Sequence, residues 1–279
     1  AIVGPQASRN AIPAASVAET SQVPLISPWS TNPATTENKR YAFRVPYTDP
    51  LSAAVMARFA HADLEAKKAA ILYDSEQSHN STSADVFAKT FKELGGTVVA
   101  TEAYTTDTLD FEAHLMRIRG QEPQVLYLPN YANEVPLQAQ QARELGIEAT
   151  LLGSDAWGTM SEGQLSEDLE GSFFSSHFAA DNVAPEARTF VTRYQERYNR
   201  LPDDVAALTY DAFGLLFRAI QSQEEIGTEA IRNGLFSVSD YRGVTGVIAY
   251  EQSGDPTKSV VVMKIQNERF KFDQLSAPQ

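Results

Sequence analysis

The chain has 279 residues, of which 43% are hydrophobic and 21% are charged, and its formal net charge is −13. This length suits two domains of ordinary size, and the acidic surface, which repels phosphate backbones, excludes nucleic acid as an expected partner. The chain contains no cysteine, which excludes disulfides, thiolate zinc sites and cysteine nucleophiles. No run approaches the roughly 18 apolar residues of a membrane-spanning helix.

The first 48 residues predict two short strands, at 1–4 and 23–26, with a helix-permissive segment between them. Residues 1–4 are typical of the end of a buried strand, and no signal-peptide pattern precedes them. Because an intact domain rarely begins in this way, we expect further residues upstream in the complete protein. The Pro- and Ser-rich segment 27–36 is typical of a structured loop.

The middle of the chain alternates strands with helices. Apolar runs at 69–73, 97–101, 124–128, 150–153 and 172–176 are separated by segments with helical periodicity. This alternation predicts βαβ units and a parallel sheet, and strands that are apolar on both faces fit a sheet covered by helices. We predict that residues 49–178 form one doubly wound lobe.

The remaining segments predict a second lobe. Residues 185–199 form an amphipathic helix pattern, 203–221 a longer apolar one, and 243–272 alternate like short strands and hairpins. We therefore predict an α/β fold of two doubly wound, Rossmann-like lobes. Lobe 1 would comprise 1–48 and 179–248, and lobe 2 would comprise 49–178 and 249–279. Repeated crossing would make a multi-strand hinge, with a ligand cleft between the lobes.

Motifs for catalysis are missing from the sequence. It has no G-x-G-x-x-G, no P-loop and no G-x-S-x-G elbow. The four histidines, His61, His79, His114 and His177, are scattered without an H-x-x-x-H pair, so we predict neither a metal site nor a cofactor. The pair Asp203-Asp204 is explained by helix capping. We expect no catalytic residues.

Polar residues that follow predicted strands are the candidates for ligand binding. In open α/β sheets ligands bind beyond the carboxyl ends of the strands, where helix N-termini offer free N–H groups and a positive dipole end. Ser8 follows the first strand, and Ser30 and Thr31 follow the second. Their hydroxyls, with these N–H groups, are placed to hold a carboxylate. Simple helix capping remains the alternative for all three.

A second set of candidates follows strands of the other lobe. Asp155 comes after 150–153, Tyr131 after 124–128, and His79 in the loop after 69–73. A carboxylate binder on one lobe and Asp155 on the other fit a zwitterion, with Asp155 pairing to an ammonium and Tyr131 forming an aromatic wall. The alternatives are that Asp155 is a turn residue and Tyr131 is packing.

Five short motifs occur in the order found in the branched-chain amino-acid-binding receptors of ABC transporters, which have the type I periplasmic-binding-protein fold. The sequence resembles this family at 1–5 with Ser8, at 23–33, at Phe43-Arg44 with Asp49, at 209–213, and at 243–248 with Gly254-Asp255. The resemblance covers essentially the whole chain, but family members usually have two further βα units before the segment that opens it.

The resemblance also implies roles for individual residues. Ser8 and Thr31 match positions that hold the ligand's α-carboxylate, and Trp29, beside Ser30, matches a backbone contact that is usually made by a small residue. Asp155 matches the acid that binds the α-ammonium, and Tyr131 an aromatic contact. The loop with Ser78 and His79 departs from the family's tyrosine-glycine pattern.

The expected function is therefore capture of an amino acid or related small carboxylate for the permease of an ABC importer, by a monomer that closes on its ligand. The location would be periplasmic or extracellular, with or without a lipid anchor to the cell envelope. An aromatic carboxylate, amide or urea-like solute is the alternative ligand, favoured by Trp29, and a ligand-sensing receptor domain is the alternative role.

Overall fold

The computed structural model describes residues 1–181, 184–251 and 253–276. The chain divides into two compact units, which are described separately below. Unit 1 comprises Ala1–Thr48, His177–Val260 and a short stretch from Leu275. Unit 2 comprises Asp49–Ser176 and Val261–Gln274.

One predicted boundary is wrong. We expected the chain to return to the second lobe at residue 249, but residues 249–260 belong to unit 1. The reason is strand pairing: β10 (Gly246–Tyr250) pairs with β11 (Pro256–Thr257) in an antiparallel hairpin of unit 1. The chain leaves this unit only after Val260.

Unit 2 is built on a sheet in which the described strands follow the order β13-β12-β8-β7-β6-β4-β5. Its parallel part consists of β4 (Lys68–Asp74), β5 (Thr97–Tyr104), β6 (Val125–Leu128), β7 (Thr150–Gly153) and β8 (Phe173–Ser176). The C-terminal strands are β12 (Val260–Ile265), antiparallel to β8, and β13 (Phe270–Ser276). All five predicted strands of this lobe are present.

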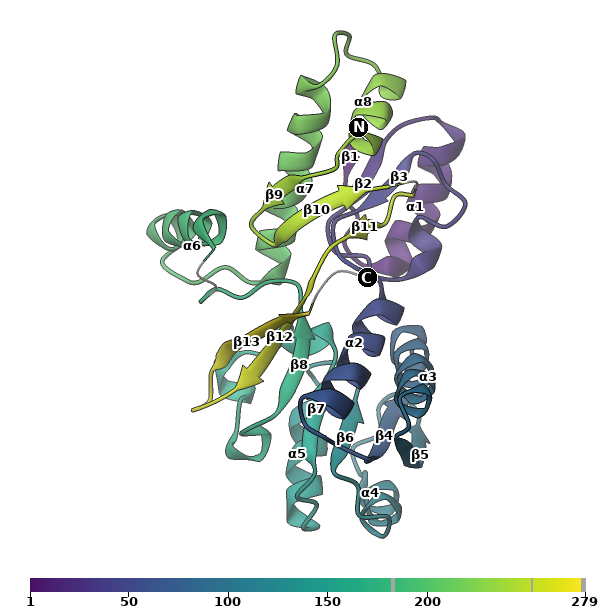
Figure 1. Ribbon diagram of the computed structural model, residues 1–279, viewed down its shortest axis with the longest axis vertical. Coiled ribbons are helices and arrows are strands. Elements are labelled where there is room, and N and C mark those ends of the chain that lie inside the picture. Colours follow the sequence, from purple (N-terminus) through teal and green to yellow (C-terminus); the bar gives the residue numbers. More distant parts are fainter. Residues whose placement is uncertain (182–183, 252, 277–279) are drawn as a thin grey trace. The chain divides into compact units, whose positions relative to one another are not determined.

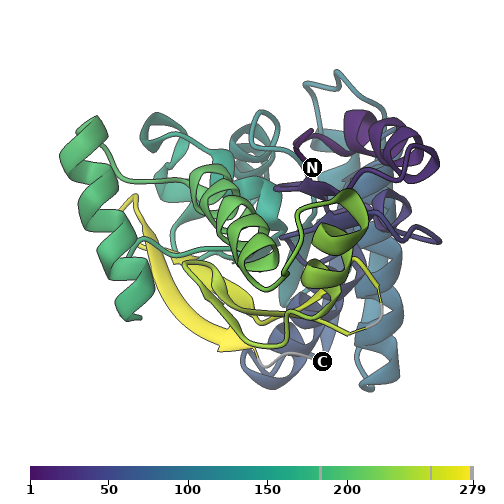
Figure 2. The same cartoon turned by 90° about the horizontal axis from the view of Figure 1, so that it is seen from above.

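Helices cover both faces of this sheet. They are α2 (Asp49–Ala62), α3 (Ser78–Glu93), α4 (Glu112–Arg119) and α5 (Val135–Glu144). Helices α2 and α3 pack together on one face, and α4 and α5 lie on the other (Figures 1 and 2). Three short 3₁₀ turns follow β7, namely η2 (Asp155–Thr159), η3 (Glu162–Gln164) and η4 (Glu167–Leu169). Burial on both faces explains why the central strands are continuously apolar.

Unit 1 contains a smaller parallel sheet of β1 (Ile2–Val3), β2 (Leu25–Ser27) and β3 (Ala42–Arg44). Small alanines of α1 (Ser8–Thr20), Ala15 and Ala18, pack on Leu25 and Ala42. Helices α7 (Asp204–Gln221) and α8 (Thr228–Phe236) bury leucines and isoleucines against the residues next to these, Ile26 and Phe43. The alternation along β2 and β3 therefore directs successive side chains into two separate cores.

The remaining elements of unit 1 are α6 (Pro185–Tyr198), η1 (Pro33–Thr35) and the antiparallel strands β9 (Tyr241–Gly243), β10 and β11. Asp203 caps α7 as predicted, because its carboxylate accepts a hydrogen bond of 2.8 Å from the N–H of Ala206. Within the described residues, the helices are all too short or too polar to cross a membrane.

Candidate ligand-binding site

Three hydroxyl-bearing side chains of unit 1 are joined by hydrogen bonds and are here called the hydroxyl cluster. Ser8 is the first residue of α1, Ser30 lies in the loop after β2, and Thr35 ends η1. The Oγ atoms of Ser8 and Ser30 are 2.8 Å apart, and Ser30 Oγ is 2.6 Å from Thr35 Oγ1. Ser30 and Thr35 are fully buried, whereas Ser8 is half-buried. The structure thus brings two of the predicted serines together at one edge of the sheet.

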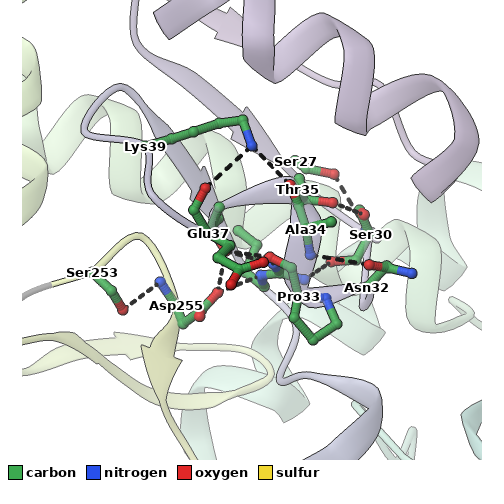
Figure 3. Close-up of polar contacts among 12 residues, drawn as sticks. Ser27, Ser30, Asn32, Pro33, Ala34, Thr35, Glu37, Lys39, Ser253 and Asp255 are labelled. Atoms are coloured by element: carbon green, nitrogen blue, oxygen red, sulfur yellow. Dashed lines mark hydrogen bonds and ion pairs between the residues drawn. The ribbon is translucent and has the colours of Figure 1, made fainter. Parts of the chain in front are cut away.

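The loop that carries this cluster is folded on its own hydrogen bonds (Figure 3). Ser27 donates to the carbonyl of Pro5 at 2.7 Å and accepts from the N–H of Ser30 at 3.2 Å. Asn32 begins η1 by accepting from the N–H of Ala34 at 3.0 Å. The loop after β2 is therefore tied to the loop after β1, which explains why Ser8 and Ser30 meet.

A buried guanidinium supports the same loop from behind. Arg44, at the end of β3, is 0% exposed and donates to the carbonyls of Ser30 at 2.8 Å and Pro33 at 3.1 Å. Its Nε lies 2.6 Å from an oxygen of Asp255, which also accepts from the hydroxyl of Thr36 at 2.6 Å. These contacts fix the carbonyls of the loop and use the hydroxyl of Thr36, but not those of Ser30 and Thr35.

Asp255 reaches Arg44 because the residue before it is glycine. The carbonyl of Gly254 accepts from the N–H of Arg44 at 2.9 Å, and a Cβ at Gly254 would overlap the carbonyl oxygen of Ala42. Only glycine allows this close approach of the two backbones. The Gly254-Asp255 motif therefore has a structural role in holding the loop of Ser30.

The N-terminus of α1 adds a partial positive charge beside Ser8. Ala7 precedes the helix, its side chain makes no capping bond, and the first turn carries no acidic side chain. The first N–H groups of a helix lack intrahelical partners and attract anions. Together with the Ser8 hydroxyl they form a set of donors that suits a carboxylate.

The other two candidates of this loop are placed differently. Thr31 is buried, at 8% exposure, directly after Ser30. The Trp29 ring is half-buried and packs against the apolar core formed by α7, α8 and the sheet. Its side chain thus contributes to the core of unit 1, and its backbone lies beside Ser30.

In unit 2, three ionisable side chains form what we call the charged group, Asp49, His79 and Asp155. One ligand atom from each lies within 4.8 Å of those of the other two. Asp49 and Asp155 are only 2% and 6% exposed, and the His79 side chain is 12% exposed. His79 Nδ1 is 3.0 Å from Asp49 Oδ1, and its Nε2 is 3.1 Å from Ser154 Oγ.

The parallel sheet brings these residues together. His79 is the second residue of α3, which follows β4, and Ser154 and Asp155 follow β7 directly. Asp49 is the first residue of α2. The carboxyl ends of parallel strands meet at one edge, which is where ligands bind in sheets of this kind.

The turn that carries Asp155 is anchored by Trp157, which is 0% exposed. The indole N–H of Trp157 donates to the carbonyl of Leu128, at the end of β6, at 3.0 Å. A Cβ at Gly153 would overlap the indole ring, so this position must be glycine for the ring to fold back under the strand. Asp155 therefore sits on a rigid turn.

A buried amide network fixes the loop after β6. Asn130 accepts from the N–H of Asp74 at 3.2 Å and from the side chain of Asn80 at 3.1 Å, and donates to Gln138 at 2.9 Å. Next to it, the Tyr131 ring stacks on His79 with centroids 5.7 Å apart and planes at 28°. The network thus orients the loop of Tyr131 relative to the helix of His79.

The electrostatics of His79 are dominated by its acidic neighbours. Burial alone lowers the pKa of His79, but the charge of Asp49, the hydrogen bond to it and the charge of Asp155 outweigh burial and raise the pKa from 6.5 to about 9. His79 is therefore an imidazolium at neutral pH. Its charge balances one of the two carboxylates, and the charged group carries a formal net charge of −1.

His79, Tyr131 and Asp155 were predicted from the sequence as ligand contacts. Asp49 and Ser154, the bonding partners of His79, were not predicted, and neither was the support that Arg44 gives to the loop in unit 1. The sequence does offer one signal for Asp49, since an acidic side chain is favoured at the start of a helix by the positive end of the helix dipole. Ser78, also predicted, is exposed at the first position of α3.

A metal ion is the other species that two carboxylates and an imidazole attract. The spacing within the charged group would allow one ligand atom from each residue to reach a common ion. Both nitrogens of His79 are already engaged in hydrogen bonds, however, and a metal would have to displace the proton shared with Asp49. The arrangement favours the proton.

Residues 1–269 match the family of periplasmic binding proteins. The chain belongs to this family. A leucine-, isoleucine-, valine-, threonine- and alanine-binding protein of Pseudomonas aeruginosa is 23% identical over 91% of this chain and 68% of its own length. A Leu/Ile/Val-binding protein of Rhizobium johnstonii is 25% identical over 92% of this chain and 70% of its own length. The predicted resemblance and the type I fold of two α/β lobes are therefore confirmed.

Solved structures of similar fold agree with this assignment. A leucine-binding protein of Thermotoga maritima superposes with a TM-score of 0.90 at 31% identity, covering 100% of this chain and 80% of that chain. A branched-chain amino acid binding protein of Streptococcus pneumoniae, in complex with isoleucine, gives 0.87 at 27%, covering 99% and 79%. A benzoate complex from Rhodopseudomonas palustris gives 0.83 at 17%, covering 99% and 77%, and is similar in fold alone.

Proposed function

We propose that this protein binds a single amino acid and delivers it to the permease of an ABC importer. The observation that carries the proposal is the opposite character of its two polar groups. The hydroxyl cluster and the α1 N-terminus present hydrogen-bond donors for an anion, whereas the charged group has a formal net charge of −1. The zwitterion of an amino acid offers one partner to each.

The roles of individual residues follow from this chemistry. The α-carboxylate accepts hydrogen bonds from Ser8, Thr31 and the first N–H groups of α1. The α-ammonium pairs with Asp155, and the ring of Tyr131 forms a wall beside it. Ser30 supports Ser8 through their shared hydrogen bond, and Trp29 contributes its backbone.

Membership of the family supports the rest of the proposal. The ligand draws the two units into a closed form by engaging both groups, and the permease recognises that form. Such a receptor acts as a monomer on the outer side of the cytoplasmic membrane, in the periplasm or outside the cell, with or without a lipid anchor. The comparisons support binding of small solutes for transport, and the names of relatives favour leucine, isoleucine, valine, threonine and alanine, whose side chains are uncharged.

An aromatic carboxylate is the alternative ligand, because a protein of the same fold was solved with benzoate. Trp29 favoured this alternative in the sequence, but its ring packs into the core of unit 1. A benzoate would also bring no cation to the charged group. Both points favour the amino acid.

Hydrolysis is another activity to consider, because Asp49, His79 and Ser154 are hydrogen-bonded in the order carboxylate, imidazole, hydroxyl, which is the order in the catalytic triad of serine hydrolases. A general base must be unprotonated, and the pKa of His79, raised to about 9, keeps it protonated at neutral pH. We therefore propose binding without catalysis. Hydrolysis of p-nitrophenyl acetate should be equally slow in the wild type and in Ser154→Ala, and a rate abolished by that change would contradict this.

A screen by melting temperature tests the ligand directly, since a ligand that binds only the folded state must stabilise it. The twenty amino acids, benzoate and 4-hydroxybenzoate are compared at equal concentration. We expect stabilisation by one or a few amino acids. Stabilisation by the benzoates alone would refute the amino-acid assignment in favour of the alternative.

A further inference from the structure

His79 differs from the other predicted ligand contacts because its side chain is already saturated by the protein. Nδ1 bonds to Asp49 at 3.0 Å, Nε2 bonds to Ser154 at 3.1 Å, and one face of the ring stacks on Tyr131. A ring held on two edges and one face cannot rotate to follow a ligand. His79 therefore acts through its charge and its volume rather than through a new hydrogen bond.

The charge of His79 lies between two buried carboxylates. Its ligand atoms and those of Asp49 and Asp155 are all within 4.8 Å of one another. Tyr127 stays neutral, because burial and the charges of Asp155 and Asp49 raise its pKa. The group thus combines two carboxylates with one imidazolium, and its formal net charge of −1 favours a further cation.

We propose that His79 is a specificity-determining residue that limits the site to ligands with one positive charge near Asp155, by supplying the second cation itself. This inference rests on the proposed function, in which Asp155 receives the ligand's ammonium. A ligand with a second ammonium close to the first would face the imidazolium at short range in a buried site, where like charges repel strongly.

Removing the imidazolium should reverse this selection. An asparagine at position 79 still offers a donor toward Asp49 but carries no charge and is smaller than histidine. The two carboxylates then share a formal charge of −2 with space beside them. Such a site favours a ligand that brings two positive charges.

The test compares two ligands of nearly identical shape, norvaline and 2,4-diaminobutyrate, which differ by a terminal methyl against a terminal ammonium. Their affinities are measured by titration calorimetry at neutral pH for the wild type, His79→Asn and His79→Gln. The control is His114→Asn, because His114 also bonds a carboxylate of unit 2, Glu102 at 3.1 Å, but lies outside the charged group. Melting temperatures establish that each variant is folded.

The wild type and His114→Asn should prefer norvaline. In the His79 variants the ratio of the two affinities should shift toward 2,4-diaminobutyrate by about tenfold or more, because removing a unit charge at this distance outweighs the ~1.4 kcal/mol of a tenfold ratio. A ratio that stays unchanged in both His79 variants overturns the inference and leaves the proposed function standing. A wild type that binds neither ligand nor any other amino acid overturns the proposed function, and the inference falls with it.

Discussion

The hydroxyl cluster of unit 1 and the charged group of unit 2 both hold polar atoms at the edge of a sheet, but they are stabilised by different interactions. Ser8, Ser30 and Thr35 are joined by neutral hydrogen bonds, and the charge that supports their loop, on Arg44, is buried behind it. Asp49, His79 and Asp155 depend on charge balance among themselves. We therefore expect pH to change the stability that the charged group contributes, and to leave the contribution of the hydroxyl cluster unchanged.

The largest change in stability is expected from substitution of Arg44, which supports the loop of the hydroxyl cluster. Arg44→Met removes a fully buried guanidinium and leaves the carbonyls of Ser30 and Pro33 without their donor. The free energy of unfolding should fall by about 3–5 kcal/mol, measured by urea denaturation.

The matched control for this change is Arg218→Met in the same unit. Arg218 is 64% exposed and lies 4.0 Å from Asp240, so its loss should cost less than about 0.5 kcal/mol. Equal losses in the two variants would show that Arg44 supports the loop no better than a surface residue does.

Asp155→Asn should have the next largest effect, on binding rather than on stability. The ligand's ammonium would lose its charged partner, so affinity for the best amino acid should fall by roughly 2–5 kcal/mol in calorimetry. Asp110→Asn is the control, because Asp110 accepts from the N–H of Glu112 at the start of α4 and belongs to neither polar group. Unchanged affinity in Asp155→Asn would refute its role.

The third prediction concerns the pH dependence of stability. The folded-state pKa of His79 lies above its unfolded value, so its contribution to stability is complete below pH 6.5 and is lost as the pH rises to about 9. A shift of this size corresponds to about 3 kcal/mol. The wild type should therefore lose its stability advantage over His79→Gln across this window.

The difference in stability between the wild type and His79→Gln reports the contribution of His79 separately from that of other titrating groups. Lys258, whose pKa burial lowers to about 8, titrates in both of them and cancels. Thermal unfolding from pH 6 to 9.5 measures the difference, with His114→Gln as the control. A difference that does not vary with pH would mean that His79 is not held as an imidazolium.

The smallest effect is expected from Ser8→Ala. It removes one donor to the ligand carboxylate and one partner of Ser30, at a cost of about 1 kcal/mol in affinity. Because Ser8 is hydrogen-bonded to the neutral hydroxyl of Ser30, the loss should be the same at pH 6.5 and 8.5. Ser16→Ala, an exposed serine on the same helix, should change nothing, and a pH-dependent loss at Ser8 would break the contrast between the two groups.

The fold and two of the three residues in each polar group were predictable from the sequence because the relevant signals are local. Strand periodicity placed the strand that precedes Asp155, and the strand–loop–helix pattern placed Ser8 and Ser30 at one sheet edge. Apart from Thr35, which lies five positions from Ser30, the residues that were missed are joined over long stretches of chain. Arg44 and Asp255 are 211 positions apart, and His79 and Ser154 are 75 apart, so no local pattern could pair them.

One error and one question that the sequence left open have physical causes of the same kind. The predicted boundary at residue 249 failed because a hairpin strand has the same alternation in whichever unit its partner lies. The direction of Trp29 could not be predicted, because a tryptophan after a strand suits either a ligand or a core. Only the neighbouring helices α7 and α8 decide between them.

The anchoring of Trp157 has a practical consequence. The chain contains two tryptophans, and each is close in sequence to a residue of one polar group. Trp29 is next to Ser30, and Trp157 is two residues from Asp155. Their fluorescence therefore provides one built-in optical reporter per unit. In a Trp29→Phe protein the remaining emission comes from an indole fully shielded from water and bonded to Leu128, and its change on adding a ligand would report events at the turn of Asp155 alone.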